Sequence, residues 1–275
     1  MISYLKQTIL VLIGLLTLAS LELTKLPDGN LHLHVLDVGQ GDSILLTTPS
    51  GKHILVDGGP DLKTLEHLGH HLPFFGRRID LLILSHPNQD HLSALPEVTK
   101  RYSVGAILLT GAPFDLTRYD ALLAQVQKQN IPVVTADPDQ DISMGDGVVI
   151  DVVWPPTKLP KDFLKNENEL SVVARVLYKN HKVLLTGDIE HGAEVSILQS
   201  GADVDSTILK VAHHGSKSSS STGFLLATSP NLALISAGAD NPYGHPHEEV
   251  VEKLERMGLK VRNTGEEGTV SITLQ

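Results

Sequence analysis

Residues 85–91, Ser-His-Pro-Asn-Gln-Asp-His, follow directly on the apolar run Ile-Asp-Leu-Leu-Ile-Leu of residues 79–84. The run predicts a buried strand, and the proline predicts a turn just beyond it. Strand ends are where α/β proteins usually present reactive groups. His86, Asp90 and His91 offer imidazole and carboxylate ligands, which suit zinc, manganese or iron. The alternative is a polar turn that opens a helix, since Asn and Asp are frequent N-caps. The density of donors favours a metal site.

Three later stretches place further donors at the end of an apolar strand or the start of a helix. Asp188 ends a Thr-Gly-Asp turn, where it could hold one metal ion or bridge two; an ordinary turn is the alternative. His213 and His214 follow another strand. Because neighbouring side chains of an extended chain point to opposite sides, we expect one of them to bind metal and the other to hydrogen-bond substrate or a ligand. Residues 241–247, Asn-Pro-Tyr-Gly-His-Pro-His, add His245, or are simply a helix start marked by proline.

The composition sets the limits of the interpretation. The chain has 275 residues, of which 41% are hydrophobic and 20% charged, so it is long enough for one large or two small domains and is not disordered. A net charge of −10 argues against a broad basic surface for nucleic acid. The absence of cysteine excludes disulfides, thiolate zinc sites and a cysteine nucleophile. Most of the 14 histidines have ordinary surface or strand positions, and those in the motifs carry the metal hypothesis.

The remaining pattern predicts a layered α/β domain, because strands with helices between them form sheets covered by helices. Strands are predicted at residues 31–38, 43–48, 53–57, 79–85, 106–110, 148–154, 172–178, 182–187, 207–212 and 232–237. Helices are predicted at residues 61–72, 117–129, 190–200 and 246–257. The serine-rich run at residues 217–221 is expected to be a flexible loop.

The N-terminal segment is uncharged and apolar over residues 8–19 and stays largely apolar to about residue 23. It is short for a membrane span but long enough for a signal-peptide core. We interpret residues 1–27 as a signal peptide or, preferably, an uncleaved membrane anchor followed by a linker. Residues 28–275 would then form an extracytoplasmic domain, either secreted or held at the membrane. A buried first helix of the domain is the alternative.

Taken in order, the motifs resemble the metallo-β-lactamase fold superfamily, and within it the ComEC-like hydrolase domains of bacterial DNA-uptake proteins. The resemblance covers nearly all of the chain from about residue 31. It rests on residues 36–42 (LDVGQGD), 56–59 (VDGG), 85–91 (SHPNQDH), 168–173 (NELSVV), 184–188 (LLTGD), 213–216 (HHGS) and 241–246 (NPYGHP). It implies an α/β fold with a four-layer αββα sandwich and a site for one or two divalent metal ions, zinc or manganese, at one edge.

The resemblance also implies roles for individual residues. The better-formed metal position would be held by Asp90, His91, Asp188 and one of His213 and His214. His86 would belong to the other position, with Asp188 between the two. Asp57 would orient the ligands from behind. Ser216 and Lys217 would bind substrate, and Asp90 and His245 would take part in catalysis.

Two positions depart from the pattern. Asn88 stands where the superfamily usually has His or Asp, and Asn168 stands where many relatives supply another histidine. A neutral amide is a poor zinc ligand, so we place both behind the ligands and expect one metal position to be weak or empty.

The function that follows is metal-dependent hydrolysis through a metal-bound hydroxide, with a phosphodiester, DNA in first place, as substrate. The enzyme would be a phosphodiesterase or nuclease. Because the net charge is negative, DNA would have to bind at the metal and at a local group of basic residues. We take this group to be Arg77, Arg78, Lys210 and Lys217. Because Asn88 and Asn168 are poor ligands, an alternative stays open. The chain would then be a non-catalytic anchored protein of the same fold with a degraded metal site. The sequence does not identify any protein partner, and protein partners stay unknown.

Overall fold

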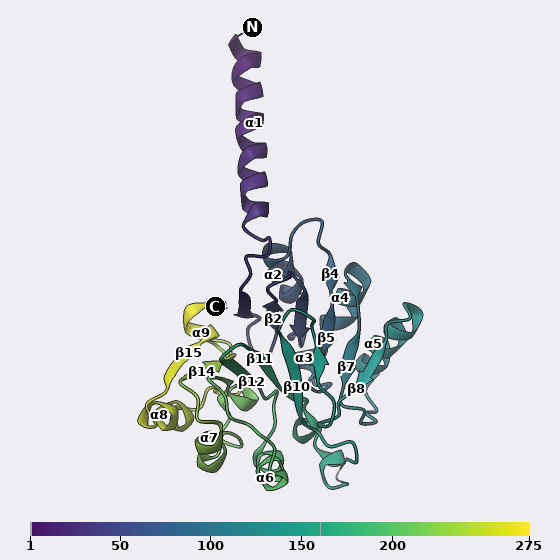
Figure 1. Cartoon of the computed structure of the whole chain (residues 1–275), viewed down its shortest axis with the longest axis vertical. Helices are drawn as coiled ribbons and strands as arrows, with labels where there is room; N and C mark the ends of the chain where they lie inside the picture. The colour runs from purple at the N-terminus through teal and green to yellow at the C-terminus, as the bar shows by residue number, and fades with distance from the viewer. Residues whose placement is uncertain (1, 160) are drawn as a thin grey trace.

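Two seven-stranded sheets lie face to face, and helices cover the outer face of each (Figure 1). The computed structural model describes residues 2–159 and 161–275. One apolar cluster fills the space between the sheets, and two more lie between each sheet and its helices. These three clusters define four layers. The predicted αββα arrangement is confirmed.

The first sheet is mixed, with an antiparallel part and a parallel part. Its strands, in spatial order, are β16 (Val270–Leu274), β1 (Leu31–Val35), β2 (Ile44–Thr47), β3 (His53–Val56), β5 (Leu81–Ile83), β7 (Ile107–Leu109) and β8 (Val133–Thr135). A separate pair is formed by β4 (Arg78–Ile79) and β6 (Ser103–Val104).

The second sheet is antiparallel at one side and parallel at the other. Its strands, in spatial order, are β15 (Lys260–Asn263), β14 (Leu232–Ile235), β13 (Ile208–Lys210), β12 (His181–Leu185), β11 (Val173–Tyr178), β10 (Val149–Trp154) and β9 (Ile142–Ser143).

The helices divide between the two outer faces. The first sheet is covered by α2 (Lys63–His71), α3 (Gln89–Leu92), α4 (Leu95–Arg101) and α5 (Thr117–Lys128). The second is covered by α6 (His191–Ser200), α7 (Thr222–Thr228) and α8 (Glu248–Arg256). Short helices lie in the connections: α9 (Thr264–Glu267), η1 (Phe163–Lys165), η2 (Glu167–Leu170) and η3 (Ala212–Gly215).

The central strands show why the sequence reads as continuous apolar runs. Leu81 and Ile83 face the cluster between the sheets, whereas Leu82 faces the helices, and all three side chains are buried. A strand covered on both faces needs apolar residues at every position. Each such side chain stabilises the fold by about 2 kcal/mol when fully buried.

The structure corrects one predicted strand. Residues 79–85 do not form a single strand but are divided between β4 and β5 at Asp80. The Asp80 carboxylate accepts hydrogen bonds from the backbone N–H of His53 and from the Arg78 side chain. These bonds hold Asp80 at the sheet margin, where the chain passes from the small β4–β6 pair into the large sheet.

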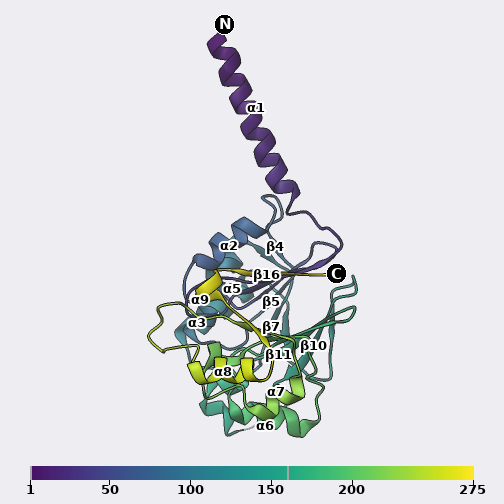
Figure 2. The same cartoon turned by 90° about the vertical axis from the view of Figure 1, so that its left-hand side faces the viewer.

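The N-terminal helix α1 (Ile2–Leu23) projects away from the domain (Figure 2). Residues Lys6–Leu23 are long and apolar enough to cross a membrane, and none of that stretch is buried against the domain. This exposure contradicts the alternative of a buried first helix.

Parallel pairing brings the motifs to one edge. Val56 pairs with Ile83 across β3 and β5, and Leu185 pairs with Lys210 across β12 and β13. Because parallel strands end at the same side of a sheet, the loops after them emerge together. Val172 N–H donates to the carbonyl of Ser85, 2.8 Å away, and joins the two sheets there.

Candidate metal centre

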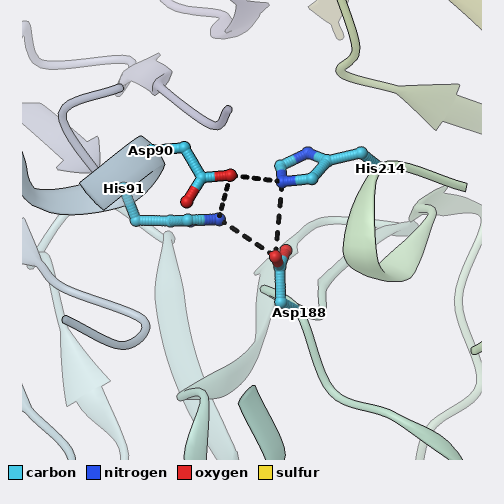
Figure 3. Close-up of side chains that lie close together, drawn as sticks. All are labelled: Asp90, His91, Asp188 and His214. Atoms are coloured by element: carbon cyan, nitrogen blue, oxygen red, sulfur yellow. Dashed lines mark ion pairs between the residues drawn. The ribbon is translucent and has the colours of Figure 1, made fainter. Parts of the chain in front are cut away.

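Four side chains from three loops converge at this edge (Figure 3). Asp90 and His91 come from α3, Asp188 from the turn after β12, and His214 from η3. Asp188 Oδ2 lies 3.2 Å from His91 Nε2 and 3.3 Å from His214 Nε2. Asp90 Oδ2 lies 3.2 Å from His214 Nε2 and 4.0 Å from His91 Nε2. One donor atom from each residue lies within 4.8 Å of the other three.

Asp188 is the centre of a larger group of imidazoles. Nε2 of His86 and Nε2 of His213 each lie 3.9 Å from Asp188 Oδ2, just outside the four-residue cluster. His86 is fully buried, whereas the His213 side chain is 21% exposed. The structure therefore gathers every predicted metal ligand around one carboxylate and distinguishes His214, within the cluster, from His213, beside it.

Within the part of the chain that the structure describes, the cluster and the neighbouring His86 contain buried polar atoms without hydrogen-bond partners. These atoms are His86 Nε2, His91 Nε2, His214 Nε2 and Asp188 Oδ1. A buried polar atom left unpaired costs about 1–3 kcal/mol, so a set of four facing one point needs an explanation. Two imidazole nitrogens and two carboxylates are donors that zinc and manganese accept. The residues present fit a divalent cation.

The charges of the cluster lead to the same conclusion. Burial opposes the charged form of His91 and of His214, but neighbouring carboxylates, Asp188 first and then Asp57 or Asp42, outweigh it and raise the pKa of both imidazoles well above the ordinary value. Burial likewise opposes ionisation of Asp188, yet these two histidines bring its pKa well below the usual range. Positive charge at this point stabilises the buried carboxylates, and either protons on the imidazoles or a bound cation can supply it.

Asp57 holds His91 from behind. Its Oδ2 accepts a hydrogen bond from His91 Nδ1 at 2.8 Å and from Ser85 Oγ at 2.6 Å, and its Oδ1 accepts from Ser85 N at 2.7 Å. These bonds leave His91 Nε2 directed at the cluster, as a carboxylate behind a metal-binding imidazole does. The structure places Asp57 directly behind His91, and its role in orienting a metal ligand stays a prediction.

Asp42 lies behind His214 as a neighbouring charge, and the sequence did not indicate it as a functional residue. Its Oδ1 lies 3.3 Å from His214 Nδ1, an ion-pair distance, while the hydrogen bond of Nδ1 goes to the Ser236 carbonyl at 2.8 Å. Its Oδ2 forms a 2.7 Å ion pair with Lys210 Nζ, and both residues are buried. The position of Asp42 in the LDVGQGD motif was the available signal.

The burial of Lys210 corrects the basic set predicted to meet DNA. Its side chain has no exposed surface and its Nζ also donates to the carbonyl of Val211 at 3.0 Å. Lys210 therefore pairs with buried groups and is not on the surface that DNA would contact. Arg77 directly precedes β4 and Arg78 begins it, so both lie before β5, at the opposite end of that strand from His86. Of the predicted set, Lys217 alone is exposed near the cluster, and its N–H donates to His247 Nδ1 at 3.2 Å.

The backbone conformation of the histidine pair differs from the predicted extended chain. His213 and His214 have φ values of 50° and 55°, in the left-handed region. Asp57 shares this conformation, with a φ of 61°. Such positions are unfavourable for residues other than glycine and are concentrated at functional sites. The left-handed turn, rather than alternation along a strand, lets both imidazoles approach Asp188.

Two glycines allow the loops to approach one another. A Cβ at Gly41 would lie 2.2 Å from the carbonyl oxygen of Asp90, and its φ is 139°. A Cβ at Gly187 would lie 2.8 Å from Cβ of Ser171, with a φ of 52°. Side chains at either position would displace Asp90 or Asp188, so the motif glycines set the spacing of the cluster.

The two asparagines that depart from the superfamily pattern bind each other. Asn88 Nδ2 donates to Asn168 Oδ1 at 2.7 Å. The carbonyl of Asn168 accepts from Ser171 Oγ at 2.8 Å, and that hydroxyl accepts from the N–H of Asp188 at 3.1 Å. The amides thus form a neutral bridge beside the cluster and support the turn that carries Asp188.

A cavity of about 150 Å³ opens beside the cluster. Asp90, Asp188 and His214 contribute to its lining, as do Gln40, Tyr243 and His245. Burial, with help from His214 and His213, lowers the pKa of His245 to about 4, so this ring is neutral at pH 7. The 3.4 Å contact of its Nδ1 with Gln40 Nε2 makes Nδ1 the acceptor and leaves Nε2–H as a donor.

His213 also lines the cavity, and Glu190, which the sequence did not single out, orients it. Glu190 Oε1 lies 3.3 Å from His213 Nδ1, and Ser218 Oγ donates to the same carboxylate oxygen at 3.1 Å. This pairing directs His213 Nε2 towards the cavity side of Asp188. His213 is therefore placed as a neighbour of the cluster that faces the cavity.

The serine-rich run differs from the predicted flexible loop. Ser219 and Ser220 are buried, and the Glu194 carboxylate accepts hydrogen bonds from the N–H groups of Ser220 and Ser221. Ser216 is also buried and its hydroxyl contacts that of Ser218 at 3.0 Å. Neither Ser216 nor Lys217 contributes to the cavity lining, and their role in substrate binding stays a prediction.

Known proteins match both the sequence and the fold. ComE operon protein 3 of Bacillus subtilis is 27% identical over 261 residues, covering 87% of this chain and 32% of that protein. Competence protein ComA of Neisseria gonorrhoeae is 30% identical over 252 residues, covering 90% and 33%. The chain therefore spans about a third of the length of these relatives. The crystal structure of the metallo-beta-lactamase fold protein YhfI from Bacillus subtilis matches with a TM-score of 0.58 and 14% identity, over 89% of this chain and 99% of that one.

The family comparison covers most of the domain. Residues 36–257 match the metallo-beta-lactamase superfamily, a range that contains every residue of the cluster and of its supporting hydrogen bonds. Members of this superfamily generally bind divalent metal ions and act as hydrolases. The chain belongs to the metallo-beta-lactamase superfamily.

Proposed function

We propose that this protein is a metal-dependent phosphodiesterase of the extracytoplasmic membrane surface, with DNA as the substrate class. The observation that carries the proposal is the cluster of Asp90, His91, Asp188 and His214, whose unpaired buried ring nitrogens face one point beside an open cavity. The relatives named for competence support DNA as the substrate class.

One metal ion per chain is the occupancy that the donors favour. The four-residue cluster offers two nitrogens and two carboxylates; His91, Asp188 and His214 would suffice to hold one ion with a position open to water, which would leave Asp90 to act on that water. A second position would have His86 and a shared Asp188, while Asn88 and Asn168 bind each other at its margin. We therefore infer a single resident ion, manganese or zinc, at the cluster.

The residues around the cavity have separable tasks. A divalent ion bound at the cluster supplies an acidified water and polarises a phosphoryl oxygen. The Asp90 carboxylate, 31% exposed towards the cavity, is placed to accept a proton from water. The Nε2–H of His245 is placed to donate to a phosphoryl oxygen, which stabilises the negative charge that develops there. His213, held by Glu190, is the candidate that, in its protonated form, donates a proton to the leaving group, while Asp90 keeps the proton taken from water.

A path for a polymer leads away from the cavity over Asn88. This residue lines the cavity and also an adjoining hollow of about 230 Å³, whose other wall includes Arg118. Arg118 Nη1 donates to Ser93 Oγ at 2.9 Å, and the arginine is exposed. We propose that Arg118 contacts a backbone phosphate next to the one cleaved, which adds positive charge in a chain of net charge −10.

We assign the location from α1. The stretch Lys6–Leu23 is apolar, exposed and long enough to cross a bilayer. Used as an uncleaved anchor, it would hold the hydrolase domain against the outer face of the membrane; a cleaved signal peptide would release the same domain.

The test is hydrolysis by the purified full chain in lipid nanodiscs. Single-stranded DNA, duplex DNA and bis-p-nitrophenyl phosphate are offered with manganese or zinc after treatment with EDTA. We expect turnover of DNA that requires the metal and is lost in His91→Ala. The matched control is His191→Ala, since the His191 side chain is 70% exposed and outside the cluster. Metal-loaded protein that cleaves no phosphodiester would favour the non-catalytic anchored protein, for which the Asn88–Asn168 bridge is the supporting feature.

A further inference from the structure

The end of α1 is fastened to one particular part of the domain. Glu22 Oε2 accepts a hydrogen bond from the N–H of Phe74 at 2.6 Å. Lys25 Nζ pairs with Glu22 Oε1 at 2.8 Å and donates to the carbonyls of Gly69 and Leu72, each at 3.3 Å. The end of α2 and the turn after it therefore lie against the end of the helix that we propose to cross the membrane (Figure 1).

That turn, residues 73–78, exposes an unusual set of side chains. Phe75 is 94% exposed and Phe74 is 60% exposed, and their rings meet edge to face with centroids 5.0 Å apart. The guanidinium of Arg77 lies 5.7 Å from the centroid of Phe74. Two adjacent exposed phenylalanines in water have no structural benefit, since each leaves most of about 150–250 Å² unburied.

We propose that residues 73–78 insert into the interface of the bilayer that α1 crosses, with Phe74 and Phe75 among the lipid headgroups and Arg77 on anionic lipid phosphates. The proposal rests on the membrane anchor assigned above. Aromatic residues are enriched at membrane interfaces, and a basic residue near an anionic surface contributes about 1 kcal/mol. Arg78 adds less, because it is paired with Asp80 at 2.7 Å.

The contact would orient the metal centre. β1 begins at Leu31, soon after α1, and β5 begins just after residues 73–78, so both strands start on the membrane side. Both strands run towards the loops that carry Gln40 and His86. A strand of five residues is about 17 Å long, so these loops lie about that far from the ends of the strands that face the membrane. Fixed at α1 and at the turn, the domain would hold its cavity at the end remote from the anionic lipids, which repel DNA.

The test measures immersion depth by spin labelling, which the absence of cysteine makes simple. Full-length Phe75→Cys, Leu12→Cys and Leu226→Cys are labelled singly and reconstituted in vesicles of phosphatidylcholine and phosphatidylglycerol. Leu12 lies within α1, and Leu226, which is 67% exposed, belongs to α7, a helix far from α1 (Figure 1). Power saturation then compares access of oxygen, which concentrates in lipid, with access of a nickel chelate, which stays in water.

We expect the ratio of oxygen to nickel access to be several-fold higher at position 75 than at position 226, and highest at position 12. Equal ratios at 75 and 226, with position 12 embedded, would overturn the proposal and leave the anchor intact. Aqueous values at all three positions would overturn both. Arg77→Gln should move the label at 75 outwards in mixed vesicles and not in pure phosphatidylcholine. Arg256→Gln, on the exposed side of α8, is the matched control.

Discussion

The buried ion pair between Lys210 and Asp42 gives the sharpest prediction about how the site is supported. The two charges lie 2.7 Å apart with side chains 0% and 2% exposed. At an effective dielectric constant of about 20, their attraction is about 6 kcal/mol, which desolvation partly offsets. Lys210→Met would leave Asp42 charged, buried and without its lysine, so we expect a loss of about 3–5 kcal/mol in the free energy of unfolding.

The assay is urea unfolding at pH 7 with EDTA, followed through the fluorescence of Trp154, which is buried and donates to the carbonyl of Glu169. The control is Lys182→Met. Its 2.6 Å pair with Asp205 has side chains 37% and 56% exposed, and its loss should cost no more than about 1 kcal/mol.

A double variant separates the effect of the ion pair on the stability of the fold from the effect of Asp42 on metal binding through His214. Asp42→Leu combined with Lys210→Met removes both charges and should recover most of the lost stability, since an apolar pair of similar volume replaces a buried ion pair without penalty. It should still bind metal about 10–100-fold more weakly, because His214 has lost the carboxylate behind it. Equal stability of Lys210→Met and Lys182→Met, or normal metal affinity in the double variant, would refute the reasoning.

Three further predictions concern separate parts of the molecule. Gly41→Ala should destabilise the fold by at least about 2 kcal/mol and weaken metal binding, because its Cβ would meet the Asp90 carbonyl, whereas Gly223→Ala, with open space around it, should not; calorimetry of metal binding and urea unfolding check both. Burial, with the nearby His71, lowers the pKa of His34 to about 3; the unfolded chain thus binds more protons below about pH 6.5, and stability should fall as the pH drops towards 3. His34→Gln should flatten that fall by about 1 kcal/mol per pH unit, and an unchanged slope would contradict the assignment. Arg118→Ala should weaken DNA binding and reduce its salt dependence by about one charge without affecting bis-p-nitrophenyl phosphate, and Arg101→Ala, paired with Glu97, should do neither.

The layers and the convergence of the motifs could be predicted because they depend on local patterns. Apolar runs such as residues 81–83 are required in strands covered on both faces, and the donors follow those strands directly. Parallel pairing then brings strand ends together, so Asp90, His91 and Asp188 lie at one edge, as expected.

The supporting interactions could not be predicted because they join distant segments. Lys210 reads as a free cation in the sequence, and only the fold reveals its pairing with Asp42, 168 positions earlier. Asn88 and Asn168 read as two weakened ligand positions, whereas the structure makes them partners. The left-handed turn at His213 and His214 likewise has no local signal, and it decides which imidazole enters the cluster.

The most direct test of the central claim is the number of manganese ions that remain bound per chain after gel filtration, measured by mass spectrometry of the metal. The wild-type chain should retain about one ion, as should His191→Ala, while His214→Ala should retain almost none. His213→Ala should keep most of the ion, since its Nε2 lies 3.9 Å from Asp188 and outside the cluster. A wild-type chain without metal, or equal retention by His214→Ala, would contradict the account.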